Sequence, residues 1–335
     1  FNMNRMPLAK RAQILGLLVE GMSLRAITRV ADCSINTVTK LLVDVGTACA
    51  VYHGKAVRNL PCKRIQCDEI WSFVGAKQKN VPEDRKADGD MGDVWTWTAI
   101  CADTKLIASY AIGSRDGLAA AQFITDLRNR LANRVQLTTD GHRAYLEAVE
   151  GAFGANIDYA MLIKIYGDAS EGQRRYSPPE VIGTEVHVIT GKPDKANAST
   201  SYVERQNLTM RMSMRRFTRL TNAFSKKLDN HEHAIALHFM HYNFGRIHKS
   251  LRVTPAMEAG IADHVWSVEE IAALVPEPTS KPRGPYKKSN EKGPRNAGPL
   301  VGVFDGLSLL RQQVSQSVRA IWRAPVAIDN RLQVV

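Results

Sequence analysis

Residues 64–74 (RIQCDEIWSFV), 94–102 (VWTWTAICA) and 106–112 (LIASYAI) are three short segments rich in β-branched and aromatic side chains. Polar and turn-forming residues separate them, most clearly in the charged stretch 77–92 (KQKNVPEDRKADGDMG). This pattern is typical of consecutive antiparallel strands joined by turns. The three segments therefore predict the first part of a β-sheet, and the chain that follows decides which kind of sheet it is.

After the third segment, helical and strand patterns alternate. Residues 117–134 predict a helix, 135–139 a fourth strand that ends at Asp140, 142–153 a second helix, and 157–166 a fifth strand. Three strands followed by helix, strand, helix and strand is the order of the ribonuclease H-like fold, in which a mixed sheet lies between helices. The expected fold class is therefore α/β, a ribonuclease H-like mixed sheet flanked by helices.

An all-α segment is expected before the sheet, with helical patterns at 8–21, 23–32 and 34–46. Ser23 and Ser34 can cap the second and third helices through their side-chain oxygens. A small core is expected from Ile14, Leu17, Leu18, Leu24, Ile27, Val30, Val38, Leu41 and Leu42.

This segment resembles the helix-turn-helix of bacterial transposases and resolvases, with residues 34–42 as the recognition helix. The side chains that this resemblance places on DNA are Arg25, Arg29, Asn36, Thr37 and Lys40. A generic three-helix interaction module remains the alternative.

Composition narrows the class of protein. The chain has 335 residues and a formal charge of +12, and because the excess lies in several clusters, a nucleic acid is the expected partner. No apolar run approaches the roughly 18 residues of a membrane span, and the amino end lacks a signal-peptide pattern, so a cytoplasmic location without a membrane partner is expected. The five cysteines contain no CxxC pair, which predicts reduced thiols and no zinc site.

The most basic stretch is 200–227 (TSYVERQNLTMRMSMRRFTRLTNAFSKK), where Glu204 precedes seven arginines and lysines without a further acid. We interpret it as a helix with an apolar face that packs on the core and a neighbouring face directed at phosphates. The alternative is a solvated amphipathic helix in which Glu204 forms an ion pair with a basic side chain nearby, such as Arg211. The apolar face contains Val203, Met210, Met214 and Phe217. The expected DNA contacts are Arg205, Arg211, Arg215, Arg216, Arg219, Lys226 and Lys227.

Three acids occupy the positions at which ribonuclease H-like enzymes hold theirs: the first strand, the end of the fourth strand and a later helix. They are Asp68, Asp140 and Glu204. The surrounding motifs are CDEIWSFVGAKQK, TTDGHRAY and YVERQNLTMRMSMRRFTRLTNAFSKK. On these motifs the chain resembles the DDE transposases of bacterial insertion sequences, and within them the insertion-sequence-one family. The resemblance covers about residues 10–270.

The resemblance implies an enzyme that cleaves and transfers DNA strands at the ends of its own element. Asp68, Asp140 and Glu204 would be catalytic and would hold two Mg²⁺ ions, for which Mn²⁺ may substitute, because the ligands are hard oxygens. The implied partners are double-stranded DNA with terminal inverted repeats, target DNA, and further copies of the chain in a synaptic complex. A DNA-binding regulator or decayed copy that no longer cuts, and a ribonuclease H-like nuclease with another substrate, remain alternatives.

Other polar residues near these motifs have competing interpretations. Glu69 should point to the opposite face of the strand from Asp68, which predicts a supporting or core role and not a simultaneous ligand. His142 is expected either to assist the site or to cap the next helix. Packing and DNA-facing roles are favoured over metal binding for His231, His233, His238 and His241, because only the last two share a helix face.

The chain is expected to have four parts: a helix-turn-helix at 1–52, the α/β domain at 60–275 with an insertion near 167–197, a basic linker at 276–299, and a tail at 300–335. The insertion is expected because the separation between Asp140 and Glu204 is long for a compact core. The linker has six prolines, three glycines and six lysines or arginines against two acids, which predicts flexibility. In the tail, residues 307–322 predict a short amphipathic helix.

Overall fold

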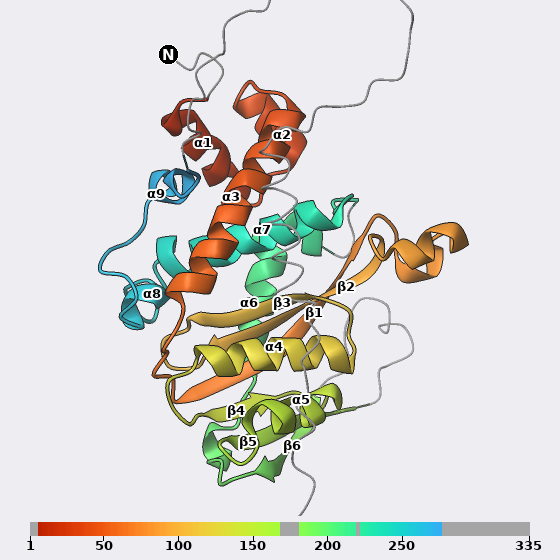
Figure 1. Cartoon of the computed structure of the whole chain (residues 1–335), viewed down its shortest axis with the longest axis vertical. Coiled ribbons are helices and arrows are strands. Elements are labelled where there is room, and N and C mark those ends of the chain that lie inside the picture. The colour runs from red at the N-terminus through yellow and green to blue at the C-terminus, as the bar shows by residue number, and fades with distance from the viewer. Residues whose placement is uncertain (1–5, 168–180, 219–221, 277–335) are drawn as a thin grey trace, which may run out of the picture. The chain divides into compact units, whose positions relative to one another are not determined.

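The computed structural model describes residues 6–167, 181–218 and 222–276 (Figure 1). The described chain up to Val275 belongs to one compact unit. The predicted linker beyond residue 276, the predicted tail with its helix at 307–322, and Arg219 lie outside the described residues.

Six strands of the described chain form one mixed sheet, in the order β3-β2-β1-β4-β5-β6. The strands are β1 (Arg64–Val74), β2 (Gly92–Cys101), β3 (Ile107–Gly113), β4 (Gln136–Thr139), β5 (Asp158–Tyr166) and β6 (Val181–Thr190). β1 pairs antiparallel with β2 and parallel with β4. On the other side of β4, β5 pairs with it in parallel, and β6 pairs antiparallel with β5. The fold is therefore α/β, and its strand order is compatible with the ribonuclease H-like fold.

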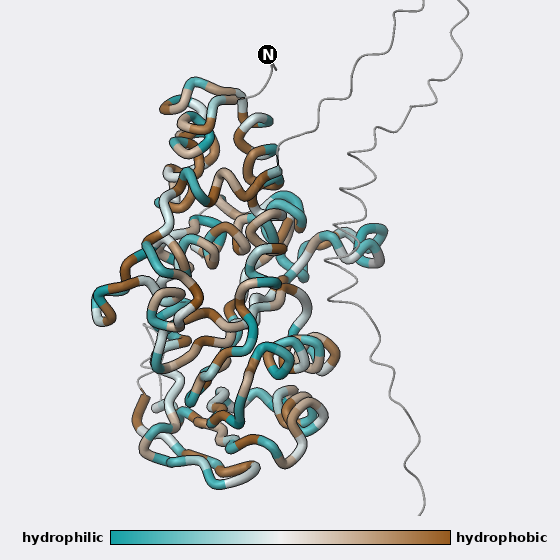
Figure 2. The backbone as a smooth tube through the Cα atoms, turned by 60° about the vertical axis from the view of Figure 1, so that its left-hand side comes forward, coloured by the Kyte–Doolittle hydropathy of each residue, from teal (hydrophilic) through white to brown (hydrophobic). Residues whose placement is uncertain are grey.

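The five predicted strands are present, with bounds close to those expected. The sixth strand, β6, lies inside the range where an insertion was expected, and it extends the sheet beyond β5. The charged stretch between β1 and β2 contains two short 3₁₀ segments, η1 (Gln78–Asn80) and η2 (Glu83–Asp88). This stretch projects from the sheet, and Figure 2 colours it mostly as hydrophilic.

Helices cover both faces of the sheet (Figure 1). On one face, Trp97 of β2 contacts Phe123 of α4 (Gly117–Arg130) and Tyr145 of α5 (Ala144–Phe153). On the other face lie α6 (Ser201–Ser213) and α7 (Leu228–Met240). Gln66 of β1 accepts hydrogen bonds from the backbone N–H groups of Tyr202 and Val203, so the first turn of α6 lies directly on the strand.

The amino-terminal helices are α1 (Leu8–Val19), α2 (Leu24–Val30) and α3 (Ile35–Ala56). The predicted caps are present, since Ser23 accepts from Ala26 N at 3.2 Å and Ser34 from Thr37 N at 3.1 Å. Most of the predicted core positions are buried or half-buried. Val30 is the exception, because it is the last residue of α2 and is 54% exposed.

The predicted end of the third helix at Gly46 is wrong, because α3 continues to Ala56. Gly46 serves a close approach between helices: a Cβ there would lie 2.5 Å from the Cβ of His233 in α7. A glycine inside a helix destabilises it modestly, and here the packing of α3 on α7 compensates. α1 in turn packs against α9 (Val268–Ala273), after the short α8 (Pro255–Glu258), so the first helices contact the last ones described.

Two expectations from composition can be compared with the structure. Cys49, Cys62, Cys67 and Cys101 are buried free thiols and Cys33 is half-buried, as expected for reduced cysteines. Among the described residues, every helix is too short or too polar to cross a membrane.

Candidate functional site

Asp68, Glu69 and Asp140 meet where the parallel pair of strands ends. Strand β4 pairs with β1 only as far as Cys67, whose partner is Thr139. Just after Cys67 the side of β1 that faced β4 is therefore open, until Val74 pairs with Ser225, and Asp140 follows β4 at that point. One carboxylate oxygen from each acid lies within 4.8 Å of the others, which makes these three residues a group that could hold a metal ion.

Glu69 lies closer to the other two acids than the sequence predicted. Its side chain does lie on the opposite sheet face from that of Asp68, where the hydroxyl of Tyr145 donates to Oε2 at 3.0 Å. The open edge of β1 nevertheless lets carboxylates from both faces approach Asp140. Alternation along β1 directs the two side chains to opposite faces, but it does not keep their carboxylate oxygens apart at this edge of the sheet, so the expectation that Glu69 is not a simultaneous ligand is not supported here.

Burial and neighbouring negative charge raise the pKa of Asp68 and of Glu69. Burial, and then the negative charges of Asp140 and Glu69, raise the pKa of Asp68 to about 7. Burial and Asp140 likewise raise the pKa of Glu69, against the opposing effect of Arg115. A group of carboxylates that disfavours its own ionisation is a group that a cation stabilises.

Backbone and side-chain donors hold Asp68 in place. Its Oδ1 accepts from the N–H of Glu69 at 2.8 Å, and its Oδ2 accepts from the side-chain amide of Asn207 in α6 at 2.9 Å. The position of this carboxylate is thus determined jointly by β1 and α6. Asn207 was not singled out from the sequence, although it lies inside the basic motif.

Arg115 is the cation nearest to the cluster. Its guanidinium contacts Glu69 Oε1 at 2.5 Å and lies 4.0 Å from Asp140 Oδ2, with 39% of its side chain exposed. It follows β3, which runs parallel to β1 because each is antiparallel to β2. The end of β3 therefore lies at the same end of the sheet as the acids. That topological signal could have identified Arg115 before the structure was known.

Glu204 lies beside the cluster and has a different partner. Lys164 of β5 donates to its Oε1 at 2.5 Å, and Thr200 donates to the same oxygen. Asn207, one helical turn further on, contacts Asp68, and the charge of Glu204 contributes slightly to the raised pKa of Asp68. The structure thus brings Asp68 and Asp140 together and places Glu204 next to them, paired with a lysine that sequence reasoning missed.

The basic stretch is not one continuous helix. α6 ends at Ser213, and Met214 takes an extended backbone so that Met214 and Phe217 both turn into the core. Arg216 turns inward too, where it donates to Ser225 Oγ at 2.8 Å and burial lowers its pKa to about 10. The exposed members of the predicted DNA-binding set in this part of the chain are Arg205, Arg211, Arg215, Lys226 and Lys227.

The predicted DNA contacts of the first helices lie on α2 and the beginning of α3. Arg25, Arg29, Asn36 and Lys40 are exposed. Thr37 is half-buried, and its hydroxyl lies 2.9 Å from that of Ser34. The four exposed side chains are therefore accessible to a partner.

The histidines have structural contacts. His231 is buried between the hydroxyls of Ser72 and Ser225, at 3.0 and 2.8 Å, and burial lowers its pKa to about 3. His238 is buried next to Gln206. The ring of His142 stacks on Trp97, and its backbone N–H donates to Asp140 Oδ1. These contacts favour packing over metal binding.

The donor set of the acidic cluster consists of carboxylate oxygens, with no thiolate or imidazole among them. Hard oxygen ligands of this kind fit Mg²⁺ or Mn²⁺. No family model matches the chain, and no curated protein matches it.

Proposed function

We propose that this protein is a DNA transposase, which cleaves DNA strands and transfers them at the ends of its own insertion sequence. The observation that carries the proposal is the approach of Asp68 and Asp140 where the pairing of β1 with β4 ends, with the basic helix α6 docked on Asp68 through Asn207. Acids at these positions are those expected for a ribonuclease H-like nuclease, and the charge of +12 suits a DNA substrate.

In this proposal Asp68 and Asp140 would hold two Mg²⁺ ions, and Glu204, now paired with Lys164, would be the third acidic ligand. When bound, such ions activate a water or a 3′-hydroxyl and stabilise the leaving oxygen. The chain itself orients the ligands: the Glu69 N–H and the Asn207 amide hold the two oxygens of Asp68.

Two cations flank the acids and would receive the phosphates of the strand being cut. Arg115 lies beside Glu69 and Asp140, and Lys164 lies beside Glu204. Both side chains are partly exposed, at 39% and 27%. A guanidinium and an ammonium at the rim of an acidic site offset the repulsion between carboxylates and an incoming phosphate.

The remaining basic residues would hold the duplex. Arg25, Arg29, Asn36, Thr37 and Lys40 are assigned to the terminal inverted repeat, Arg205, Arg211, Arg215 and Lys227 to the duplex near the cut, and Lys226 to the DNA strand at the site. Because the two ends of an element must be brought together, the active form is a homo-oligomer on double-stranded DNA.

The test is cleavage of DNA that carries the inverted repeats flanking the coding region, in the presence of Mg²⁺. We expect nicking at the 3′ ends of the repeats, and a loss of at least about a hundredfold in Asp68→Asn and in Asp140→Asn. Both variants should still bind the same DNA, since neither side chain is assigned to the duplex.

Three outcomes would contradict the proposal. Specific binding without nicking would identify a regulator that does not cut. Nicking without preference for the repeats would identify a nuclease with another substrate. Nicking that survives both substitutions would show that these acids are not the catalytic site.

A further inference from the structure

A row of aromatic rings, each with a cation beside it, begins at the acidic cluster and runs along β1 and β2. The row consists of Trp95, Trp71, Phe73 and Phe224, and is called the aromatic row below. Trp71 and Trp95 are directly paired across β1 and β2. Glu69, Trp71 and Phe73 alternate along β1 and so share one face of the sheet.

Three of the rings lie close enough to form a continuous surface, and Trp95 is paired with Trp71 across the two strands. Ring centroids are 5.6 Å apart between Trp71 and Phe73, and 4.7 Å apart between Phe73 and Phe224. The interplanar angles are 35° and 31°, so neighbouring rings are only moderately tilted. Phe224 belongs to the segment before α7, so two distant parts of the chain build the row.

A cation accompanies each ring. The guanidinium carbon of Arg115 lies 4.7 Å from the ring of Trp95. Lys77 Nζ lies 5.9 Å from the ring of Trp71 and 6.0 Å from that of Phe73. Lys226 Nζ lies 3.3 Å from the ring of Phe224. Because Arg115 also contacts Glu69, the row is joined directly to the acidic cluster.

The aromatic row is accessible. Helices α4 and α5 cover this face as far as Trp97, which is fully buried. Beyond that point the four rings of the row are all half-buried. Large aromatic side chains that remain partly exposed side by side are unusual on a surface without a ligand.

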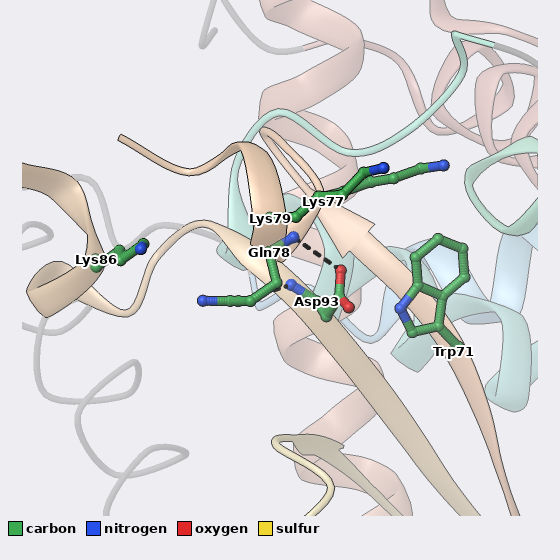
Figure 3. A pocket seen from close by; sticks show the side chains of 6 residues that line it. All are labelled: Trp71, Lys77, Gln78, Lys79, Lys86 and Asp93. Atoms are coloured by element: carbon green, nitrogen blue, oxygen red, sulfur yellow. Dashed lines mark hydrogen bonds between the residues drawn. The ribbon is translucent and has the colours of Figure 1, made fainter. Parts of the chain in front are cut away.

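A hollow of about 540 Å³ adjoins the row, between Trp71 and the charged stretch after β1. Trp71 and Lys86 lie at its opposite ends, and paired hydrogen bonds between Gln78 and Asp93 form part of its wall (Figure 3). This volume is within the range of small-ligand sites and leaves room for an unstacked base. The hollow is lined by Trp71, Lys77, Gln78, Lys79, Lys86 and Asp93.

We propose that the aromatic row binds an unpaired DNA strand next to the acidic cluster. Bases stack on Trp71, Phe73 and Phe224, while Lys77 and Lys226 meet the phosphates between them. Proteins that bind single strands combine aromatic platforms with cations in this way, because every base offers a ring face whatever its sequence. A duplex keeps its bases stacked on one another, so the row selects the unpaired form.

The role of this strand as the one being cut rests on the proposed function, but its binding does not. Binding is therefore measured in EDTA, where metal-dependent cleavage is absent. The probe is a fluorescein-labelled oligothymidylate of about 20 nucleotides, followed by fluorescence anisotropy with the full chain. The same thymidylate annealed to its complement serves as the duplex probe.

We expect Trp71→Ala and Phe224→Ala each to weaken binding of the single strand by about tenfold, and Trp71→Phe to retain most of it, because a smaller ring still stacks. Duplex binding should change by less than about twofold. Lys77→Gln and Lys226→Gln are exposed changes that leave the rings in place. Each should weaken binding and make its salt dependence shallower by about one phosphate contact.

Tyr202→Ala is the matched control. Tyr202 is also exposed, at 41%, and Lys105 lies 3.2 Å from its ring, but it stands on α6, apart from the row. This variant should bind the single strand like the wild type.

Unchanged affinity in Trp71→Ala and Phe224→Ala, with wild-type melting temperatures, would overturn the proposal, as would an equal loss for single strand and duplex. If the alanine variants misfold, unchanged affinity in both lysine variants would overturn it. If no nicking is observed, the proposed transposase function fails but binding of the single strand is still expected. Failure of the proposed function and failure of the strand-binding proposal can therefore be told apart.

Discussion

The strand acids Asp68, Glu69 and Asp140 and the helix acid Glu204 are held in opposite ways. The strand acids are crowded together by the sheet, and the pKa values of Asp68 and Glu69 are raised. The carboxylate of Glu204 already accepts hydrogen bonds from the ammonium of Lys164 and the hydroxyl of Thr200. Carboxylates that lie close together repel one another, so a divalent cation stabilises them. A carboxylate that is paired with a lysine must first break that ion pair before it can bind a cation.

This difference suggests how the site would assemble. The strand acids form a preorganised group, because backbone pairing determines where Asp68 and Asp140 lie. In the proposed function, Glu204 would complete the group only if α6 kept its contact with Asp68 and the glutamate turned away from Lys164. Glu69 is the rival for the third ligand position, since its carboxylate is already within reach.

The largest expected effect tests which glutamate completes the site. Glu204→Gln should lower Mg²⁺-dependent nicking by at least about a hundredfold, because the amide is a poor ligand for a hard cation. Glu258→Gln, an exposed glutamate on α8, is the control and should leave nicking unchanged. Full activity in Glu204→Gln would mean that Glu69 takes the third position and that Glu204 is a partner of Lys164 only.

A smaller effect is expected when the ion pair between Lys164 and Glu204 is removed. Lys164→Met removes a positive charge beside the acids and releases Glu204, so Mn²⁺ affinity should rise by about three- to tenfold. The Mn²⁺ affinity is measured by electron paramagnetic resonance titration, from the signal of the free ion. Lys195→Met is the matched control, because Lys195 is exposed in the segment that contacts Gln136, at the opposite end of β4. Unchanged or weaker Mn²⁺ binding in Lys164→Met would show that Glu204 does not move into the cluster.

The smallest effect concerns the support of Glu69. Tyr145→Phe leaves the buried Oε2 of Glu69 without the hydroxyl that donates to it, which should destabilise the fold by about 1–3 kcal/mol. Thermal unfolding followed by circular dichroism should show a melting temperature lower by several degrees. Tyr159→Phe is the control: its hydroxyl lies 2.9 Å from the uncharged Thr139 Oγ1, and its loss should cost less. Equal shifts in the two variants would argue that the charge on Glu69 is unimportant for stability.

Local patterns were sufficient for much of the fold. Alternating β-branched and aromatic residues predicted five strands near their observed bounds, and the serine caps of α2 and α3 are where the sequence placed them. Local patterns failed where a residue serves a distant neighbour. Gly46 looks like a helix end in sequence, yet it allows α3 to approach His233. The arginine run looks like one helix, yet Met214 and Phe217 turn into the core and interrupt it.

The candidate site divides in the same way. The sequence by itself determined that Asp68 lies in the first strand and that Asp140 follows the fourth, because strand patterns and turns are written in neighbouring residues. Only the tertiary structure decided which cation each carboxylate contacts. Arg115 is 46 residues from Glu69, and Lys164 is 40 residues from Glu204, so sheet order and helix docking bring these pairs together. The short pairing of β4 with β1 likewise decided that Glu69 could join the acids, because it leaves open the edge around which that side chain reaches.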